Sequence, residues 1–242
     1  ITERTRAILM TNPGNPTGVV LSREEMRLMA DIAKEHDLFL ISDEVYREII
    51  YTGEKVSSML EMEDAAENVV VIDSVSKRFS ATGARVGALI SRNHALMDQA
   101  MKLCQGRLCT ATLDQVGAAA MYDRLKPEYY TSVREEYRRR KDAVVEALSK
   151  IPGVEFRSPE GAFYLMVTLP VDDAEKLQYF LLEEFQDKGE TVMVTPAEGF
   201  YTDPALGRNK VRIAYVTNPE DVTRAIELLG LGIRAYNEKQ GR

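Results

Sequence analysis

The sequence predicts an α/β fold for its first half, followed by a smaller α+β domain. In residues 1–128, short continuous apolar runs alternate with helical patterns, which is typical of a mostly parallel sheet with helices on both faces. From about Glu128, a long charged helical pattern precedes several short strand-like runs, which favours a small, largely antiparallel sheet. We therefore expect two domains, residues 1–128 and 129–242.

The first half contains four strand-like apolar runs. They lie at residues 7–11, 38–41, 69–72 and 86–90. A turn rich in Pro and Gly, residues 12–18, follows the first run. Ser22 and Glu25 then match a capping box, which predicts a helix that extends to about Glu35.

The second half begins with a long helix that includes the basic run 138–141. Glu135 and Glu136 lie four residues before Arg139 and Arg140, so we interpret this run as a solvated, ion-paired helix face rather than a nucleic-acid site. The remaining elements follow from apolar patterning. We expect strands at residues 154–156, 162–167, 192–194 and 211–215, and helices at residues 173–188 and from 220 onward.

Composition excludes several classes of function. The 242 residues carry 31 Lys and Arg against 38 Asp and Glu, and a net charge of −7 gives no electrostatic reason to expect nucleic acid or an anionic membrane. No apolar run approaches the ~18 residues of a membrane-spanning helix. The spacing of Cys104 and Cys109 matches no metal motif, and we interpret both as reduced core thiols of a cytoplasmic protein.

Polar side chains follow the first three predicted strands. They are Asn15, then Asp43 and Tyr46, then Ser74 and Lys77. Ligands of open α/β sheets bind at the carboxyl ends of the strands. A lysine can form a Schiff base with an aldehyde cofactor, and a carboxylate can keep a pyridine nitrogen protonated. Alone, each residue would be an ordinary turn, cap or surface residue, but together they indicate a cofactor site.

Four motifs resemble those of the class I and II aminotransferases. Residues 12–18 read N-P-G-N-P-T-G, similar to the family turn N-P-x-N-P-T-G, and residues 43–46 read D-E-V-Y, similar to D-E-x-Y. Residues 74–77 and 83–87 resemble S-x-S-K followed by G-x-R-x-G, with Arg85 eight residues after Lys77 as in the family. Residues 211–214 resemble the late arginine motif. The resemblance covers the whole chain, in the family's order.

This resemblance implies an enzyme that uses pyridoxal 5′-phosphate and is a homodimer. The chain would be the C-terminal half of the cofactor-binding large-domain sheet, followed by the small domain. Lys77 would bind the cofactor covalently and shuttle the substrate's Cα proton. Asp43 would pair with the pyridinium nitrogen, and Tyr46 and Asn15 would hydrogen-bond the phenolate oxygen. Asn15 would also lie against the substrate.

The resemblance also implies sites for phosphate and carboxylate groups. Ser74 and Arg85 would hold the cofactor phosphate. Arg212 lies in an apolar run, where a buried arginine needs an anion, and would bind the α-carboxylate of the substrate. Arg107 is a candidate for a distal carboxylate, and an ordinary surface arginine is the equal alternative. The segment around Lys77 is similar to bacterial aspartate aminotransferases, so we expect aspartate and 2-oxoglutarate as substrates.

Two alternatives remain open within this resemblance. The same site could serve a C–S β-lyase, or the chain could be the aminotransferase-like effector domain of a transcription regulator. The family fold also has an N-terminal part, with a phosphate-binding helix start and a ring-stacking aromatic, that has no counterpart here. We therefore expect residues 7–11 to form an apolar edge strand that is prone to association, with little activity in this segment alone.

Overall fold

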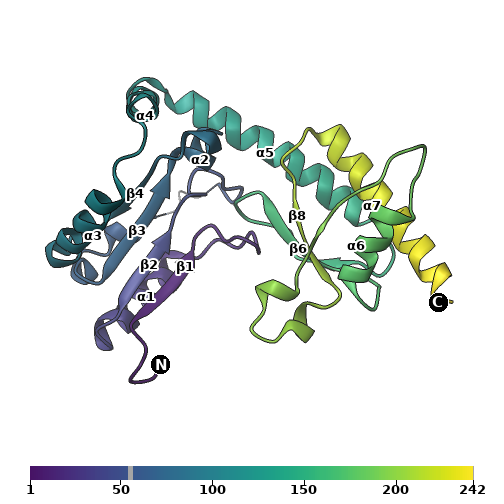
Figure 1. Cartoon of the computed structure of the whole chain (residues 1–242), viewed down its shortest axis with the longest axis horizontal. Helices are drawn as coiled ribbons and strands as arrows, with labels where there is room; N and C mark the ends of the chain where they lie inside the picture. Colours follow the sequence, from purple (N-terminus) through teal and green to yellow (C-terminus); the bar gives the residue numbers. More distant parts are fainter. Residues whose placement is uncertain (54–56, 242) are drawn as a thin grey trace. The chain divides into compact units, whose positions relative to one another are not determined.

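The computed structural model describes residues 1–53 and 57–241 and divides into two compact units (Figure 1). The first unit consists of residues 1–15, 19–132 and 160–162, less the undescribed residues 54–56. The second consists of residues 16–18, 133–159 and 163–242, less residue 242. Each unit has its own four-stranded sheet, as an α/β fold followed by an α+β fold would require.

The sheet of the first unit has the strand order β1-β2-β3-β4. Its strands are β1 (Ala7–Thr11), β2 (Phe39–Asp43), β3 (Val69–Ser74) and β4 (Gly87–Ile90). The first three are parallel, and β4 is antiparallel to β3. Residues 75–86 form only a short connection between β3 and β4, which favours an antiparallel neighbour over a parallel crossover. The predicted α/β class with a mostly parallel sheet is confirmed.

The register of the parallel strands brings their carboxyl ends together. Thr11 pairs with Asp43, and Asp43 pairs with Ile72 on the next strand. The residues that follow β1, β2 and β3 therefore leave the same edge of one sheet. β1 is at the end of the strand order, as expected, and its Leu9 side chain is 73% exposed.

Helix α1 (Arg23–Glu35) covers one face of this sheet. The Ser22 hydroxyl accepts the Glu25 N–H at 3.1 Å, and the Ser22 N–H donates to the Glu25 carboxylate at 2.8 Å, which confirms the predicted capping box. The apolar side of α1 packs into a core with residues from all three parallel strands. Its main members are Met26, Ala30 and Ala33 of α1 and Met10, Leu40, Val69 and Val71 of the sheet.

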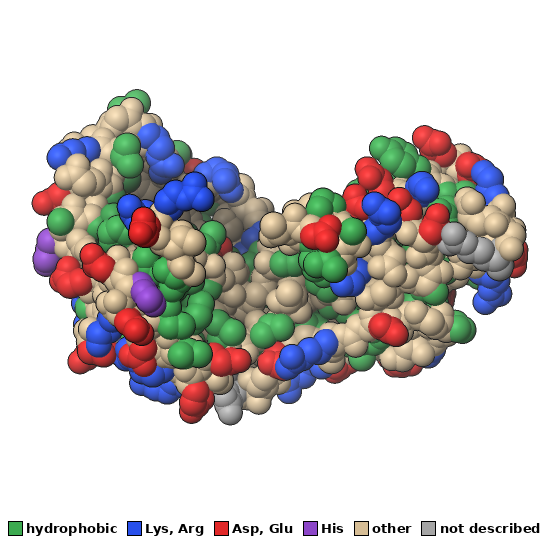
Figure 2. Space-filling model, turned by 90° about the horizontal axis from the view of Figure 1, so that it is seen from below, with side chains coloured by type: hydrophobic (Ala, Val, Ile, Leu, Met, Phe, Trp, Pro, Cys, Tyr) green, Lys and Arg blue, Asp and Glu red, His purple; other side chains and the backbone are tan. Residues whose placement is uncertain are grey.

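The remaining helices of the first unit are short or exposed. They are η1 (Met59–Glu61), η2 (Glu63–Ala65), α2 (Val75–Arg78), η3 (Thr82–Ala84), α3 (His94–Arg107) and α4 (Thr112–Arg124). Apolar side chains of α3 and α4 are exposed, including Leu103 and Leu113, and Figure 2 shows hydrophobic side chains between the charged ones on this unit, at the left of the view. Cys104 and Cys109 are also exposed. Their interpretation as core thiols was wrong, because Cys104 on α3 and Cys109 just after it lie on a surface that the described part of this chain does not cover.

The second unit contains an antiparallel sheet of order β5-β6-β8-β7. Its strands are β5 (Glu155–Phe156), β6 (Tyr164–Thr168), β7 (Thr195–Pro196) and β8 (Lys210–Ala214). Its helices are α6 (Ala174–Glu183), η4 (Glu198–Phe200), η5 (Pro204–Gly207) and α7 (Pro219–Lys239), and α5 (Pro127–Leu148) leads into it. Glu136 of α5 pairs with Arg139 and Arg140, so this part of the predicted ion-paired face is confirmed.

Two predicted boundaries in the second unit were wrong. Helix α6 ends at Glu183 rather than at residue 188, and residues 192–194 are not a strand. The Val194 N–H donates to the side-chain carbonyl of Gln178 at 2.8 Å, so a buried side chain takes the place of a strand partner. In the described part of the chain, no helix is long and apolar enough to cross a membrane.

Candidate active site

The loop after β1 is anchored to the end of β2. The Asn12 N–H donates to the Asp43 carbonyl at 3.0 Å, and the Asn12 side chain accepts the Leu21 N–H at 3.0 Å. A hydrogen bond from the Gly14 N–H to the Val19 carbonyl, at 2.8 Å, closes the loop. Asn15 is half-buried in this loop, so the predicted cofactor ligand is held beside the carboxyl ends of the strands. Asn12, which is 1% exposed, is the residue that anchors it.

Asp43 is a half-buried carboxylate at the end of β2. One carboxylate oxygen accepts the Val45 N–H at 3.1 Å. Burial raises the pKa of Asp43, the Val45 hydrogen bond opposes this rise, and the negative charge of Asp73 adds to it. A carboxylate with one neutral donor and a nearby like charge is well suited to receive a cationic N–H group.

Tyr46 lies in the turn that follows β2 and is 4% exposed. The turn is closed by backbone hydrogen bonds from the Arg47 N–H to the Glu44 carbonyl, at 2.9 Å, and from the Ile49 N–H to the Tyr46 carbonyl, at 2.8 Å. These bonds give Tyr46 a defined backbone position, directly after the Val45 amide that binds Asp43. The D-E-V-Y motif is therefore one local structure.

Ser74 and Lys77 lie on either side of the start of the one-turn helix α2. The Ser74 hydroxyl accepts the Ser76 N–H at 3.1 Å, which caps the helix and leaves its own O–H to donate to a ligand. Lys77 is partly exposed. After Lys77, Phe79 is buried and packs edge-on against Tyr122, with ring centroids 5.0 Å apart. The lysine is thus carried by a short element that is fixed at both ends.

Arg85 ends the short helix η3 in a left-handed conformation, with φ of 55°. Such a conformation is uncommon for residues other than glycine and often occurs at functional sites. The guanidinium donates to the Thr82 carbonyl at 3.0 Å and is otherwise exposed. The Val75 N–H donates to the Val86 carbonyl at 3.2 Å, so the backbone beside Arg85 is tied to the start of α2.

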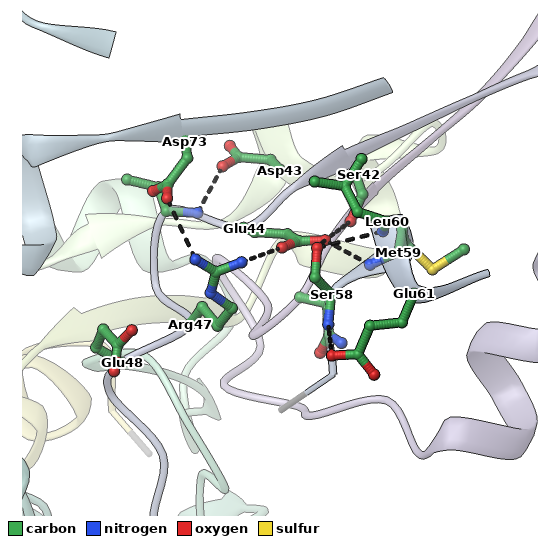
Figure 3. A network of polar contacts seen from close by, with 12 residues as sticks. Ser42, Asp43, Glu44, Arg47, Glu48, Ser58, Met59, Leu60, Glu61 and Asp73 are labelled. Atoms are coloured by element: carbon green, nitrogen blue, oxygen red, sulfur yellow. Dashed lines mark hydrogen bonds and ion pairs between the residues drawn. The ribbon is translucent and has the colours of Figure 1, made fainter. Parts of the chain in front are cut away.

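A chain of alternating charges lies beside these residues, and Figure 3 shows its part from Glu44 through Arg47 to Asp73. Glu44 pairs with Arg47 at 2.9 Å, and Arg47 lies 3.6 Å from Asp73. Asp73 pairs with Arg78 at 2.6 Å, and Arg78 pairs with Glu48 at 2.8 Å. Sequence reasoning missed this network. A signal was present, because Asp73 ends an apolar strand and Arg78 directly follows Lys77, positions where a charge needs a partner.

Arg107 lies apart from the strand ends, at the end of α3. Its side chain is exposed and lines an open pocket of about 500 Å³. The pocket is lined by Val86, Gly87, Met101, Cys104, Gln105, Arg107, Leu108, Cys109, Thr110 and Gln115. The structure therefore gives Arg107 a place in a pocket beside the start of β4, on a different element from the strand-end residues.

Arg212 belongs to the second unit, in β8. Its guanidinium carbon lies 4.8 Å from the ring centroid of Tyr164 and 5.1 Å from that of Phe200. Rings at these distances attract a cation and fix the plane of the guanidinium. Arg212 is half-buried between these aromatic side chains, in an environment suited to a planar carboxylate.

The chain matches the family model "Aminotransferase class I and II" over residues 1–229. It is 32% identical to the aspartate aminotransferase of Bacillus subtilis, over 94% of this chain and 57% of that protein. It is 31% identical to aromatic-amino-acid aminotransferase 2 of Thermococcus litoralis, over 94% of this chain and 57% of that protein.

A solved structure, the aromatic aminotransferase of Pyrococcus horikoshii, superposes with a TM-score of 0.84 at 30% identity. The match covers 99% of this chain and 62% of that structure, so the chain spans about three fifths of the length of these relatives. The strand-end residues, the fold and the family model agree, and the chain belongs to the class I and II aminotransferases.

Proposed function

We propose that the protein containing this chain transfers the amino group of an L-amino acid to a 2-oxo acid with pyridoxal 5′-phosphate. We propose aspartate as donor, 2-oxoglutarate as acceptor, a homodimeric assembly and a cytoplasmic location, to which the two exposed free cysteines are suited. The observation that carries the proposal is the placement of Asp43 and Lys77. Asp43 is the last residue of β2 and Lys77 lies just after β3, so both are at the carboxyl ends of adjacent parallel strands. The negative charge of Asp73, in β3, contributes to the raised pKa of Asp43.

The residues at this edge fit the cofactor. Asp43 is a half-buried carboxylate whose pKa is raised by its burial and by the nearby negative charge of Asp73, and the positive charge of a protonated pyridine nitrogen would offset both effects. The Ser74 hydroxyl can donate to a phosphate while it accepts the Ser76 N–H. Bound there, pyridoxal phosphate supplies an electron sink for the bond that breaks at the substrate Cα.

The side chains of this chain would then have separate tasks. Lys77 Nζ would bind the cofactor, take the proton from the substrate Cα and later return it. Tyr46 and Asn15 would orient the ring through its phenolate oxygen, with Asn15 also in contact with the substrate. Ser74 and Arg85 would hold the phosphate, and the free N–H groups of the exposed Arg85 guanidinium suit this role.

Arg212 would bind the α-carboxylate of the amino acid. Its guanidinium lies against Tyr164 and Phe200, so less conformational entropy is lost when a carboxylate binds it. A carboxylate held in a bidentate manner fixes the direction of the Cα–H bond, which aligns that bond for proton transfer to a base. The aromatic neighbours would keep water away from this ion pair.

The test of the cofactor site is chemical labelling. The intact protein is incubated with pyridoxal phosphate and borohydride, digested and mapped by mass spectrometry. We expect the pyridoxyl group on Lys77, and we expect Lys77→Ala to lose transamination almost completely. Lys102, which lies on the exposed helix α3, is the matched control. A label on Lys102 with none on Lys77 would end the assignment.

The substrate proposal has its own test at Arg107. If Arg107 binds a distal carboxylate, Arg107→Ala should lower kcat/KM for aspartate. The expected loss in transition-state binding is about 2–5 kcal/mol. The value for alanine should change much less, because alanine has no second carboxylate. Equal losses for both amino acids would remove Arg107 from substrate recognition, and a screen that includes phenylalanine would then decide between dicarboxylic and aromatic donors.

A further inference from the structure

Arg78, the residue after the proposed catalytic lysine, is a buried cation with a defined set of partners. It is 7% exposed and pairs with Asp73 at 2.6 Å and with Glu48 at 2.8 Å. The ring of Tyr122 lies 5.6 Å from the guanidinium carbon. The Nε atom of Arg78 is buried with no hydrogen-bond partner in the described part of the chain. The desolvation cost of a buried ion pair can exceed the Coulombic energy that the pair gains, so stability alone is a poor reason for a buried arginine here.

Arg78 joins the helical turn of Lys77 to two other segments. Asp73 ends the apolar part of β3, and its other carboxylate oxygen accepts the Ser74 N–H at 2.7 Å. Glu48 lies in the turn after β2, two residues beyond Tyr46. One guanidinium therefore ties α2 both to its own strand and to the segment that carries Asp43 and Tyr46.

Arg78 also neutralises the charge that acts on Asp43. The carboxylate of Asp73 contributes to the raised pKa of Asp43. Arg78 lies against Asp73 at 2.6 Å, and Arg47 lies at 3.6 Å from it while also pairing with Glu44. If Arg78 lost its charge, the more distant Arg47 would be the one cation left at Asp73 among the described residues. The less neutralised charge of Asp73 would then favour the protonated, neutral form of Asp43.

We propose that Arg78 is a positioning residue of the active site, which keeps Asp43 in its carboxylate form by neutralising Asp73 and fixes the turn that carries Lys77. The inference rests on the proposed function, since it concerns the ion pair that Asp43 would make with the cofactor. Several charged and titratable groups face this network from the surrounding elements. They are Glu44, Arg47 and Glu48 after β2, Tyr122 on α4 and Tyr130 on α5.

The experiment compares four variants of the full-length holoenzyme. Arg78→Gln removes the charge, and Arg78→Lys keeps it without the planar fork. The double variant Asp73→Asn/Arg78→Gln removes both charges of this pair, so Asp73 is not left as an unpaired carboxylate that acts on Asp43. Glu48 loses its Arg78 partner in the single and the double Gln variant alike, so their comparison isolates the charge of Asp73. Arg124→Gln, at the exposed end of α4, is the control. For each variant, equilibrium dialysis measures pyridoxal phosphate affinity, and kcat/KM is measured across pH. Urea unfolding reports whether the variant is folded.

Arg78→Gln should weaken pyridoxal phosphate binding about tenfold and move the acid limb of the kcat/KM profile upward by about one pH unit. For Arg78→Lys, we expect both the affinity for pyridoxal phosphate and the position of the acid limb to lie between those of Arg78→Gln and the wild type. The double variant should return the acid limb to the wild-type position or below it, since the negative charge of Asp73 then no longer acts on Asp43. A purely structural role for Arg78 cannot produce this recovery.

Two results would overturn the inference. One is an acid limb in Arg78→Gln that coincides with those of the wild type and Arg124→Gln. The other is a double variant that stays shifted like Arg78→Gln. If Arg78→Gln does not fold, the double variant and Arg78→Lys still decide between a positioning role and a purely structural role for Arg78. Failure of the wild type to retain pyridoxal phosphate at Lys77 would instead reject the proposed function, before any variant is compared.

Discussion

Asp43 and Glu44 are neighbouring carboxylates at the end of β2, but they lie in opposite environments (Figure 3). Glu44 is 1% exposed, and its carboxylate accepts bonds from Ser42, Ser58, the Met59 N–H and Arg47. Asp43 is half-buried and accepts the Val45 N–H. Successive side chains of a strand point to opposite faces, so one residue enters the core and the next faces the strand-end site.

The difference shows how one motif can contain a carboxylate that stabilises the fold beside a carboxylate that can bind a ligand. The hydrogen bonds of Glu44 connect the turn after β2 to η1, so its charge is used within the fold. In the described part of the chain, Asp43 accepts the Val45 N–H rather than a comparable set of donors, so a cationic ligand group can pair with its carboxylate and offset the burial that raises its pKa. Mutations should therefore affect activity at Asp43 and stability at Glu44.

The largest effect is expected for Asp43→Asn. We expect this variant to lose activity by on the order of a thousandfold, because a neutral amide cannot stabilise a protonated ring nitrogen. Its free energy of unfolding should stay within about 1 kcal/mol of the wild type, since the amide can still accept the Val45 N–H. Steady-state kinetics and urea unfolding of the same preparation test this. An Asp43→Asn variant that is active but less stable than the wild type would show that Asp43 contributes to stability rather than to activity.

Glu44→Ala should show the opposite result. The change leaves Arg47, the Ser58 hydroxyl and the Met59 N–H without their shared acceptor, so we expect a loss of about 3 kcal/mol in the free energy of unfolding. Glu35→Ala, at the exposed end of α1, is the matched control and should change stability by less than about 0.5 kcal/mol. Equal unfolding midpoints for the two variants would show that the bonds of Glu44 contribute little.

The smallest effect concerns pH. Because the pKa of Asp43 is raised in the folded state, the folded protein binds this proton more tightly than the unfolded chain does. Stability from this group is therefore lost as pH rises through the window between the two pKa values, from about pH 4 upward. Asp43→Asn removes this loss, so we expect it to exceed the wild type in stability above that window by less than about 1 kcal/mol. Equal pH dependence of urea midpoints for both proteins would contradict this.

Local patterns determined much of the fold. Ser22 and Glu25 are three residues apart, so their capping box needs no distant partner and could be read directly. The apolar runs of β1, β2 and β3 likewise predicted strands of a parallel sheet, although β1 is exposed along much of its length. The helices α3 and α4 were not predicted from the sequence. Several of their apolar residues, such as Leu103 and Leu113, are exposed, and Ala118 of α4 is the one residue of the two helices that is buried in the described part of the chain, so their pattern does not mark a continuous buried face.

The sequence by itself determined the order of the chemical groups, with Asn15, Asp43 and Lys77 each placed after a predicted strand. The parallel register then brought those strand ends to one edge. Only the tertiary structure decided which charges neutralise each other. The pairing of Arg78 with Glu48 joins residues 30 apart in the chain, and the contact of Arg47 with Asp73 joins two separate strand ends. Such pairs depend on how distant segments pack, and the spacing of residues along the chain does not predict that packing.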